Sequence, residues 1–203
     1  MTTVPYEHCK LSDVAEIFLG FNPSRKVHEA SSSLSAQFLQ VKDVVDQRLP
    51  LNSEFKEIHL PSTTNFSRQL LQLGDVVVSV RGTLLKCALI EQSPSPLIAS
   101  ANFVVVRTNS EVLKPRVLWA YLCSESVQSY MQNRSTGTVQ PSINISEIKD
   151  IALSLPSVET QAKIDQMLAA SEQQYEHAQM ASHLRRHEAL DISATFLHVT
   201  NNE

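Results

Sequence analysis

The segment from residue 134 to residue 144, RSTGTVQPSIN, is the richest polar loop in the chain and contains every kind of side chain that reads DNA well by hydrogen bonding. Arginine, glutamine, asparagine, serine and threonine bond to phosphates and to base edges. The candidate DNA-binding residues here are Arg134, Thr138, Gln140 and Asn144. A surface turn built on Gly137 and Pro141 would explain the same composition, so the pattern alone leaves both interpretations open.

Two smaller basic clusters are further candidates for contact with DNA. Arg81 and Lys86 flank a Gly-Thr turn, and arginine paired with guanine is the commonest specific contact to a base. Ser24, Arg25 and Lys26 follow Pro23 and form a weaker candidate. An ordinary solvent-exposed loop would explain each of these two clusters as well.

The chain has no recognisable catalytic motif. His183 and His187 have the four-residue spacing of a helical metal site, but the pair lacks a further ligand in a known motif, and a solvated helix face explains it better. The three cysteines lie far apart without CxxC spacing, and four glycines are too few for a glycine-rich phosphate loop. We therefore expect a protein that is not an enzyme by itself and that binds no metal or cofactor.

Composition places the chain among ordinary globular proteins. Apolar residues make up 42% and charged residues 19% of the 203 positions, and the net charge of −4 argues against a nucleic-acid binder held by charge alone. No apolar run approaches the length of a membrane span, and the start has no secretory signal. We expect a soluble, cytoplasmic protein without contact to a membrane.

Residues 1–156 contain all nine prolines and alternate between strand and helix patterns. Their charge is balanced, with 14 basic and 14 acidic residues. We expect an α/β domain with a twisted mixed sheet. Strands are predicted over 38–45, 75–80, 86–90, 103–106 and 151–155, a helix from Pro115 to about 132, and a short helix over 146–150.

Residues 157–203 contain neither proline nor glycine, and this predicts one long helix from Ser157 to about residue 190. A seam with alternating four- and three-residue spacing runs along it, weakened by Ser171, Ser182 and Arg185. A helix of about 33 residues is roughly 50 Å long, so we expect it to need a partner helix. The apolar seam residues are Ile164, Leu168, Tyr175, Ala178 and Ile192.

Four motifs occur in an order and spacing that resemble one half of the specificity subunit of type I restriction–modification systems. The first is an opening strand with a Pro-Ser loop, and the second is a Gly-Asp strand that ends in Arg-Gly-Thr. The third is a Gly-Thr-Val-Gln loop, and the fourth is an Ile-x-Leu-x-Leu-Pro strand that leads into the long helix. They cover residues 10–24, 73–83, 137–144 and 151–164.

The resemblance implies a target recognition domain over 1–156, followed by a helix over 157–203 that serves dimerisation and docking of modification subunits. It implies that a modification subunit supplies adenine methylation from S-adenosylmethionine. It also implies a restriction subunit that supplies translocation and cleavage with ATP and Mg. This chain would choose the double-stranded DNA target and would hold no cofactor.

From Met1 and the polar tail we expect a half-length subunit, which would pair as a homodimer and read an interrupted palindrome. The alternative is a coiled-coil assembly or regulatory protein that docks on modification subunits without reading DNA.

Overall fold

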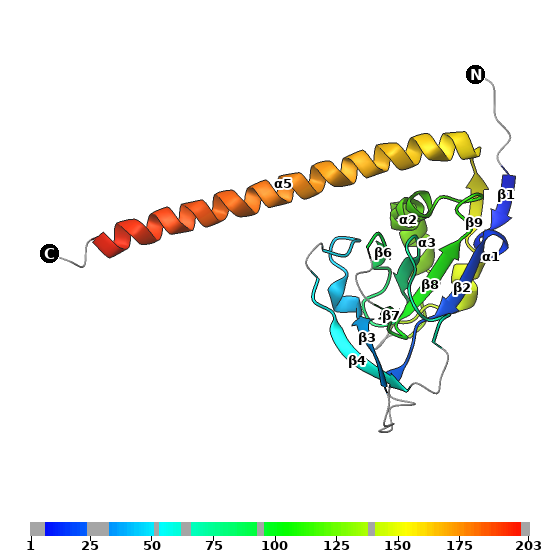
Figure 1. Ribbon diagram of the computed structural model, residues 1–203. Coiled ribbons are helices and arrows are strands. Elements are labelled where there is room, and N and C mark those ends of the chain that lie inside the picture. The colour runs from blue at the N-terminus through cyan, green and yellow to red at the C-terminus, as the bar shows by residue number, and fades with distance from the viewer. Residues whose placement is uncertain are drawn as a thin grey trace, which may run out of the picture. The chain divides into compact units, whose positions relative to one another are not determined.

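A four-stranded antiparallel sheet, in the order β2-β8-β5-β6, lies at the centre of the fold (Figure 1). The computed structural model describes residues 7–23, 33–50, 53–61, 66–92, 96–137 and 141–199. The strands are β2 (Ala15–Leu19), β5 (Val76–Ser79), β6 (Cys87–Leu89) and β8 (Phe103–Thr108). Every residue of β5 is buried, because both faces of this sheet are covered. This explains why its sequence is continuously apolar instead of alternating.

Helices cover one face of the central sheet. These are α2 (Pro115–Cys123), α3 (Glu125–Gln132) and α4 (Ile145–Lys149). Val76 and Val78 of β5 pack in one cluster with Leu118, Leu122 and Met131 from the helices. The single helix predicted over 115–132 is wrong in one respect, since it is interrupted at Ser124. The backbone of Ser124 is extended, and its hydroxyl donates to the carbonyl of Tyr121.

A three-stranded sheet, in the order β4-β3-β7, provides residues of the cluster on the other face. Its strands are β3 (Ser33–Leu39), β4 (Lys56–Pro61) and β7 (Leu97–Ala99). β3 pairs antiparallel with β4 and parallel with β7, so this sheet is mixed. The α/β class is confirmed, although the strands form several sheets instead of one.

The strand predicted over 38–45 is wrong beyond Leu39. A 3₁₀ turn, η2 (Val41–Asp43), follows β3 there. The carboxylate of Asp43 accepts a hydrogen bond of 2.7 Å from the backbone N–H of Gln40 and so closes the turn. A short polar side chain that bonds to the backbone three residues earlier favours a turn over a strand.

The first strand of the chain and the strand that precedes the long helix pair with each other. β1 (Glu7–Lys10) pairs antiparallel with β9 (Ala152–Leu155), and α1 (Leu11–Val14) follows β1. The N–H of Leu11 donates to the carbonyl of Ile151 at 2.9 Å.

The chain divides into two compact units, Met1–Ala162 and Lys163–Glu203. Gln161, 1% exposed, explains why this division falls after the predicted boundary at 156/157. Its side chain accepts from the N–H of Lys114 and donates to the carbonyl of Val112, both at 2.9 Å. The first turn of the long helix is therefore part of the first unit.

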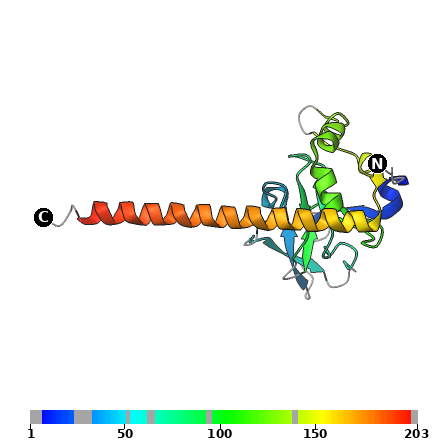
Figure 2. The same ribbon diagram turned by 90° about the horizontal axis from the view of Figure 1, so that it is seen from above.

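The long helix is α5 (Val158–Val199), unbroken over 42 residues and about 63 Å long (Figure 2). It extends past the predicted end near residue 190, because no glycine or proline stops it. Its apolar side chains are spread around the helix and not confined to one face. In the described residues, no helix combines the length and apolar character that crossing a membrane requires.

Candidate nucleic-acid interface

The Arg81 turn and the 134–144 segment, which are far apart in sequence, are joined by backbone hydrogen bonds. Arg81 and Ser142 form an antiparallel bridge, and the N–H of Ile143 donates to the carbonyl of Val80 at 2.9 Å. Thr136 and Ser142 close the base of the segment by two mutual backbone bonds of 2.9 Å. Two of the predicted DNA-binding regions therefore lie side by side, and we call residues 81–83, 134–137 and 141–144 together the recognition face.

Side chains beneath the recognition face fix the shape of the Arg81 turn. Gly82 has a φ of +75°, which glycine adopts without strain. The hydroxyl of Ser79 donates to the carbonyl of Thr83 at 2.6 Å and accepts the N–H of Lys86 at 2.9 Å. Because Ser79 is fully buried, these bonds anchor the turn to the end of β5.

Leu85, which precedes Lys86 in the same turn, lies in the left-handed region with a φ of +62°. Such a conformation costs a residue other than glycine roughly 1–3 kcal/mol. The buried side chain and two amide groups offset this cost, since the side-chain amides of Gln47 and Gln128 each donate to the Leu85 carbonyl at 3.3 Å. The turn is thus held on its inner side by a buried side chain and hydrogen bonds.

Three predicted DNA-binding residues are exposed on the recognition face: Arg81, Arg134 and Asn144. In the described part of the chain, the guanidinium of Arg81 has no hydrogen bond or ion pair. Asn144 precedes α4, but its side chain does not cap the helix. Both side chains therefore offer hydrogen-bonding groups to a ligand.

The side chain of Arg134 is held by two neighbours from different helices. Its guanidinium carbon lies 3.6 Å from the centre of the Tyr130 ring, at the end of α3. Its Nε lies 2.9 Å from Oε2 of Glu147 in α4. A partly exposed cation–π contact and an exposed ion pair each contribute at most about 1 kcal/mol, so their main effect is to orient the guanidinium.

The side chain of Lys86 is bound to the backbone of the protein and does not extend freely into solvent. Its ammonium donates to the backbone carbonyls of Val41 at 3.2 Å and Val44 at 2.8 Å, and its side chain is half-buried. These bonds tie η2 to the start of β6. A contact between Lys86 and DNA stays a prediction, but two of its three donors are already used.

The remaining predicted contacts lie outside the described residues. These are Ser24, Arg25, Lys26, Thr138 and Gln140. Thr138 and Gln140 belong to the segment whose two ends, at Gly137 and Pro141, are part of the recognition face.

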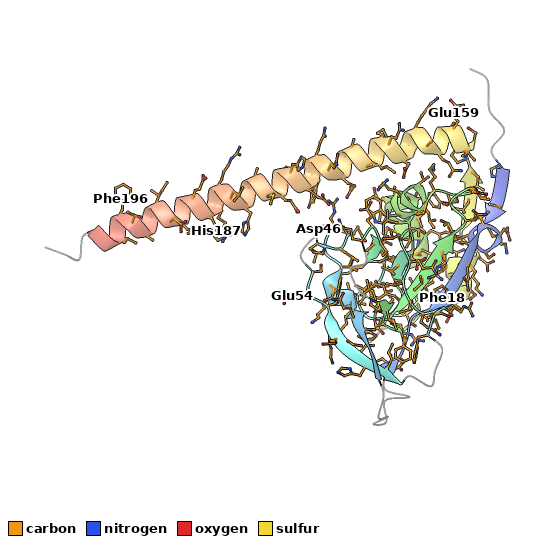
Figure 3. All side chains as sticks on the ribbon, in the orientation of Figure 1. Phe18, Asp46, Glu54, Glu159, His187 and Phe196 are labelled. Atoms are coloured by element: carbon orange, nitrogen blue, oxygen red, sulfur yellow. The ribbon has the colours of Figure 1, made fainter. Side chains whose placement is uncertain are left out.

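Sequence patterns did not predict an ion pair between the residue that precedes β5 and a residue of β8, in which the carboxylate is buried and the guanidinium is half-buried. Asp75, which is 1% exposed, accepts hydrogen bonds of 2.8 and 2.7 Å from Nε and Nη2 of Arg107. The hydrogen bonds that Arg107 donates to Asp75 raise the pKa of Arg107. Its guanidinium carbon also lies 5.3 Å from the centre of the ring of Phe18, which is labelled in Figure 3. In the sequence, each of these charged residues adjoins an apolar run, which is a sign that it could be buried and paired. Only the fold shows that the two residues contact each other.

Among the described residues, no three His, Cys, Asp or Glu side chains are placed to hold a metal ion. The rings of His183 and His187 lie 4.4 Å apart on α5. The recognition face also has no nucleophile paired with a base in its described residues. Its exposed groups are suited to hydrogen bonding with a polar, anionic ligand.

The model of the type I restriction modification DNA specificity domain matches residues 3–181. This chain belongs to that family. A curated relative, the type I restriction enzyme EcoBI specificity subunit of Escherichia coli, is 23% identical over 130 residues. That match covers 63% of this chain and 27% of the relative.

Solved structures of type I systems share the fold of this specificity domain. The HsdS subunit from Thermoanaerobacter tengcongensis matches with a TM-score of 0.62 and 16% identity, over 87% of this chain and 44% of that one. A chain from a study of complex assembly and conformational transition of the type I R-M system matches with a TM-score of 0.61 and 18% identity, over 89% and 42%. This chain thus spans less than half of the length of each of these relatives.

Proposed function

We propose that this chain selects the DNA sequence on which separate modification and restriction subunits act. The observation that carries the proposal is the recognition face, where Arg81, Arg134 and Asn144 are exposed in a domain of the DNA specificity family. The balanced charge of residues 1–156 fits this role, because base-edge contacts give specificity while partner subunits supply phosphate attraction.

In this proposal, the chemistry belongs to the partners. A modification subunit would bind S-adenosylmethionine and methylate adenine, and a restriction subunit would use ATP and Mg for translocation and cleavage. This chain would contribute the choice of site and no reacting group.

We propose further that two copies pair through antiparallel α5 helices. The predicted seam continues by the same four-residue step from Ile192 to Phe196, because the helix is longer than expected. The seam side chains Tyr175, Ile192 and Phe196 are 37%, 58% and 73% exposed, and Phe196 stands out from the helix in Figure 3. A two-fold pair would bury the same residues from both copies and present two identical recognition faces. The DNA target would then be an interrupted palindrome.

A second exposed apolar group on α5 suits the modification subunit. Met180 and Leu184 are 68% and 56% exposed. In the heptad that places Tyr175, Ala178 and Ser182 on the seam, both residues fall at outward positions. They would remain accessible after two α5 helices pair.

Selection from a library of duplexes with randomised centres tests the function. The full chain, co-purified with its modification subunits, should enrich duplexes that share a motif with inverted repeats. A bound pool that stays random would contradict DNA reading. Retention of the modification subunits in that case would favour the assembly protein that docks without reading DNA.

A further inference from the structure

Arg134 differs from Arg81, the other arginine of the recognition face, in having two side-chain neighbours. Tyr130 lies against the flat face of its guanidinium, and Glu147 pairs with Nε. The two neighbours come from α3 and α4, while Arg134 itself lies in the turn after α3, where its N–H donates to the carbonyl of Met131 at 3.1 Å. Three separate segments therefore determine where this guanidinium lies.

This arrangement leaves one edge of the guanidinium for a ligand. Arginine has five N–H donors in a planar fork. With Nε beside the Glu147 carboxylate and the ring of Tyr130 against one face, the terminal Nη1 and Nη2 groups remain as a pair of donors. Two parallel donors match the O6 and N7 acceptors of guanine in the major groove.

The Glu147 carboxylate also changes how Arg134 responds to phosphate. The ion pair of an arginine and a carboxylate has almost no net charge, so it attracts a phosphate weakly. The carboxylate also repels a phosphate that approaches. A guanine edge is uncharged, so the carboxylate opposes it far less. The pair therefore disfavours attachment to any DNA backbone more than it disfavours the reading of a base.

We propose that Tyr130 and Glu147 are positioning residues that orient Arg134 toward a guanine edge and weaken its binding to phosphate. This inference rests on the proposed function, because it assumes that the recognition face meets DNA. It adds that specificity at one base pair depends on two residues that need not touch the DNA.

The test compares the enriched duplex with the unselected random pool, using the full chain with its modification subunits at several salt concentrations. Glu147→Gln should strengthen binding to the random pool and steepen its salt dependence by about 0.9 in log–log slope. It should lower the ratio of the two affinities at least about fivefold, the smallest effect expected for one bidentate base contact. A carboxylate that acts only through its charge would, once removed, strengthen binding to both DNA pools alike and leave their affinity ratio unchanged.

Tyr130 provides a matched pair of variants. Tyr130→Phe keeps the ring and should keep the affinity ratio, whereas Tyr130→Leu should lower it. In an Arg134→Gln background, Glu147→Gln should no longer change the ratio. The inference is overturned if the wild-type complex selects a motif but Glu147→Gln and Tyr130→Leu both keep its ratio and salt slope. A wild-type complex that selects no motif instead contradicts the proposed function itself.

Discussion

At the scale of single residues, the buried pair of Asp75 and Arg107 explains the Gly-Asp motif that precedes β5. The carboxylate accepts two bonds from Arg107 and one of 2.8 Å from the N–H of Gln72. Arg107 also donates to the carbonyl of Leu70 at 2.9 Å, so the pair connects β8 to the loop before β5. Removal of either partner would leave the other charge without its hydrogen bonds and its opposite charge, and this loss destabilises the folded state.

Asp75→Asn should therefore lower the free energy of unfolding by about 3 kcal/mol, since it leaves the guanidinium of Arg107 without its counter-charge. Chemical denaturation of the full chain measures this. Asp150→Asn is the matched control, because Asp150 is exposed and pairs at 2.6 Å with exposed Lys10. Equal destabilisation by the two substitutions would show that the buried pair has no special role.

Arg81 has a different role from Arg107, because it is exposed and unpaired within the described residues. Arg81→Gln should weaken binding to the enriched duplex by at least about fivefold, as expected for loss of one base or phosphate contact. Lys56→Gln on β4 removes one exposed charge that is not part of the recognition face, and it should have a smaller effect. Filter binding at fixed salt compares the two, and equal losses would mean that only net charge matters.

At the scale of elements, short apolar runs predicted β5, β6 and β8, because strands that are buried in the core are rich in apolar residues. β4 and β7 were not predicted, since KEIHLP and LIA lack a clear strand pattern of their own and form strands by pairing with β3. The break at Ser124 was missed because an apolar helical pattern continues across it. The end of α5 was placed too early, because no residue marks it.

The seam of α5 makes a prediction at this scale. Tyr175→Glu puts a charge on the seam of both copies and should shift the full chain from dimer to monomer. Met180→Glu is the control, because the added charge lies at an outward position. It should leave the dimer intact and reduce binding of the modification subunits.

Sedimentation equilibrium of the full chain distinguishes these outcomes. A wild-type chain that stays monomeric at high concentration and with modification subunits present would contradict pairing between copies. Dissociation by Met180→Glu as well as by Tyr175→Glu would contradict the proposed seam.

At the scale of the whole molecule, the proposed DNA-binding face and the proposed pairing seam belong to different units of the chain. The recognition face belongs to Met1–Ala162, and the exposed seam residues belong to Lys163–Glu203. Residue types alone predicted which polar segments are candidates for binding DNA. That the Arg81 turn lies beside the 134–144 segment, and that Lys86 is held by backbone carbonyls, depends on long-range contacts that composition does not encode.

Mapping of methylated adenines tests the central claim, that this chain chooses the DNA site, most directly. Genomic DNA would be sequenced from cells that express the modification and restriction subunits with and without this chain. The account predicts methylation at a single interrupted palindrome that depends on the chain, and a different or lost motif when Arg81 and Arg134 are both replaced by glutamine. Methylation at the same motif in the absence of this chain would contradict the account.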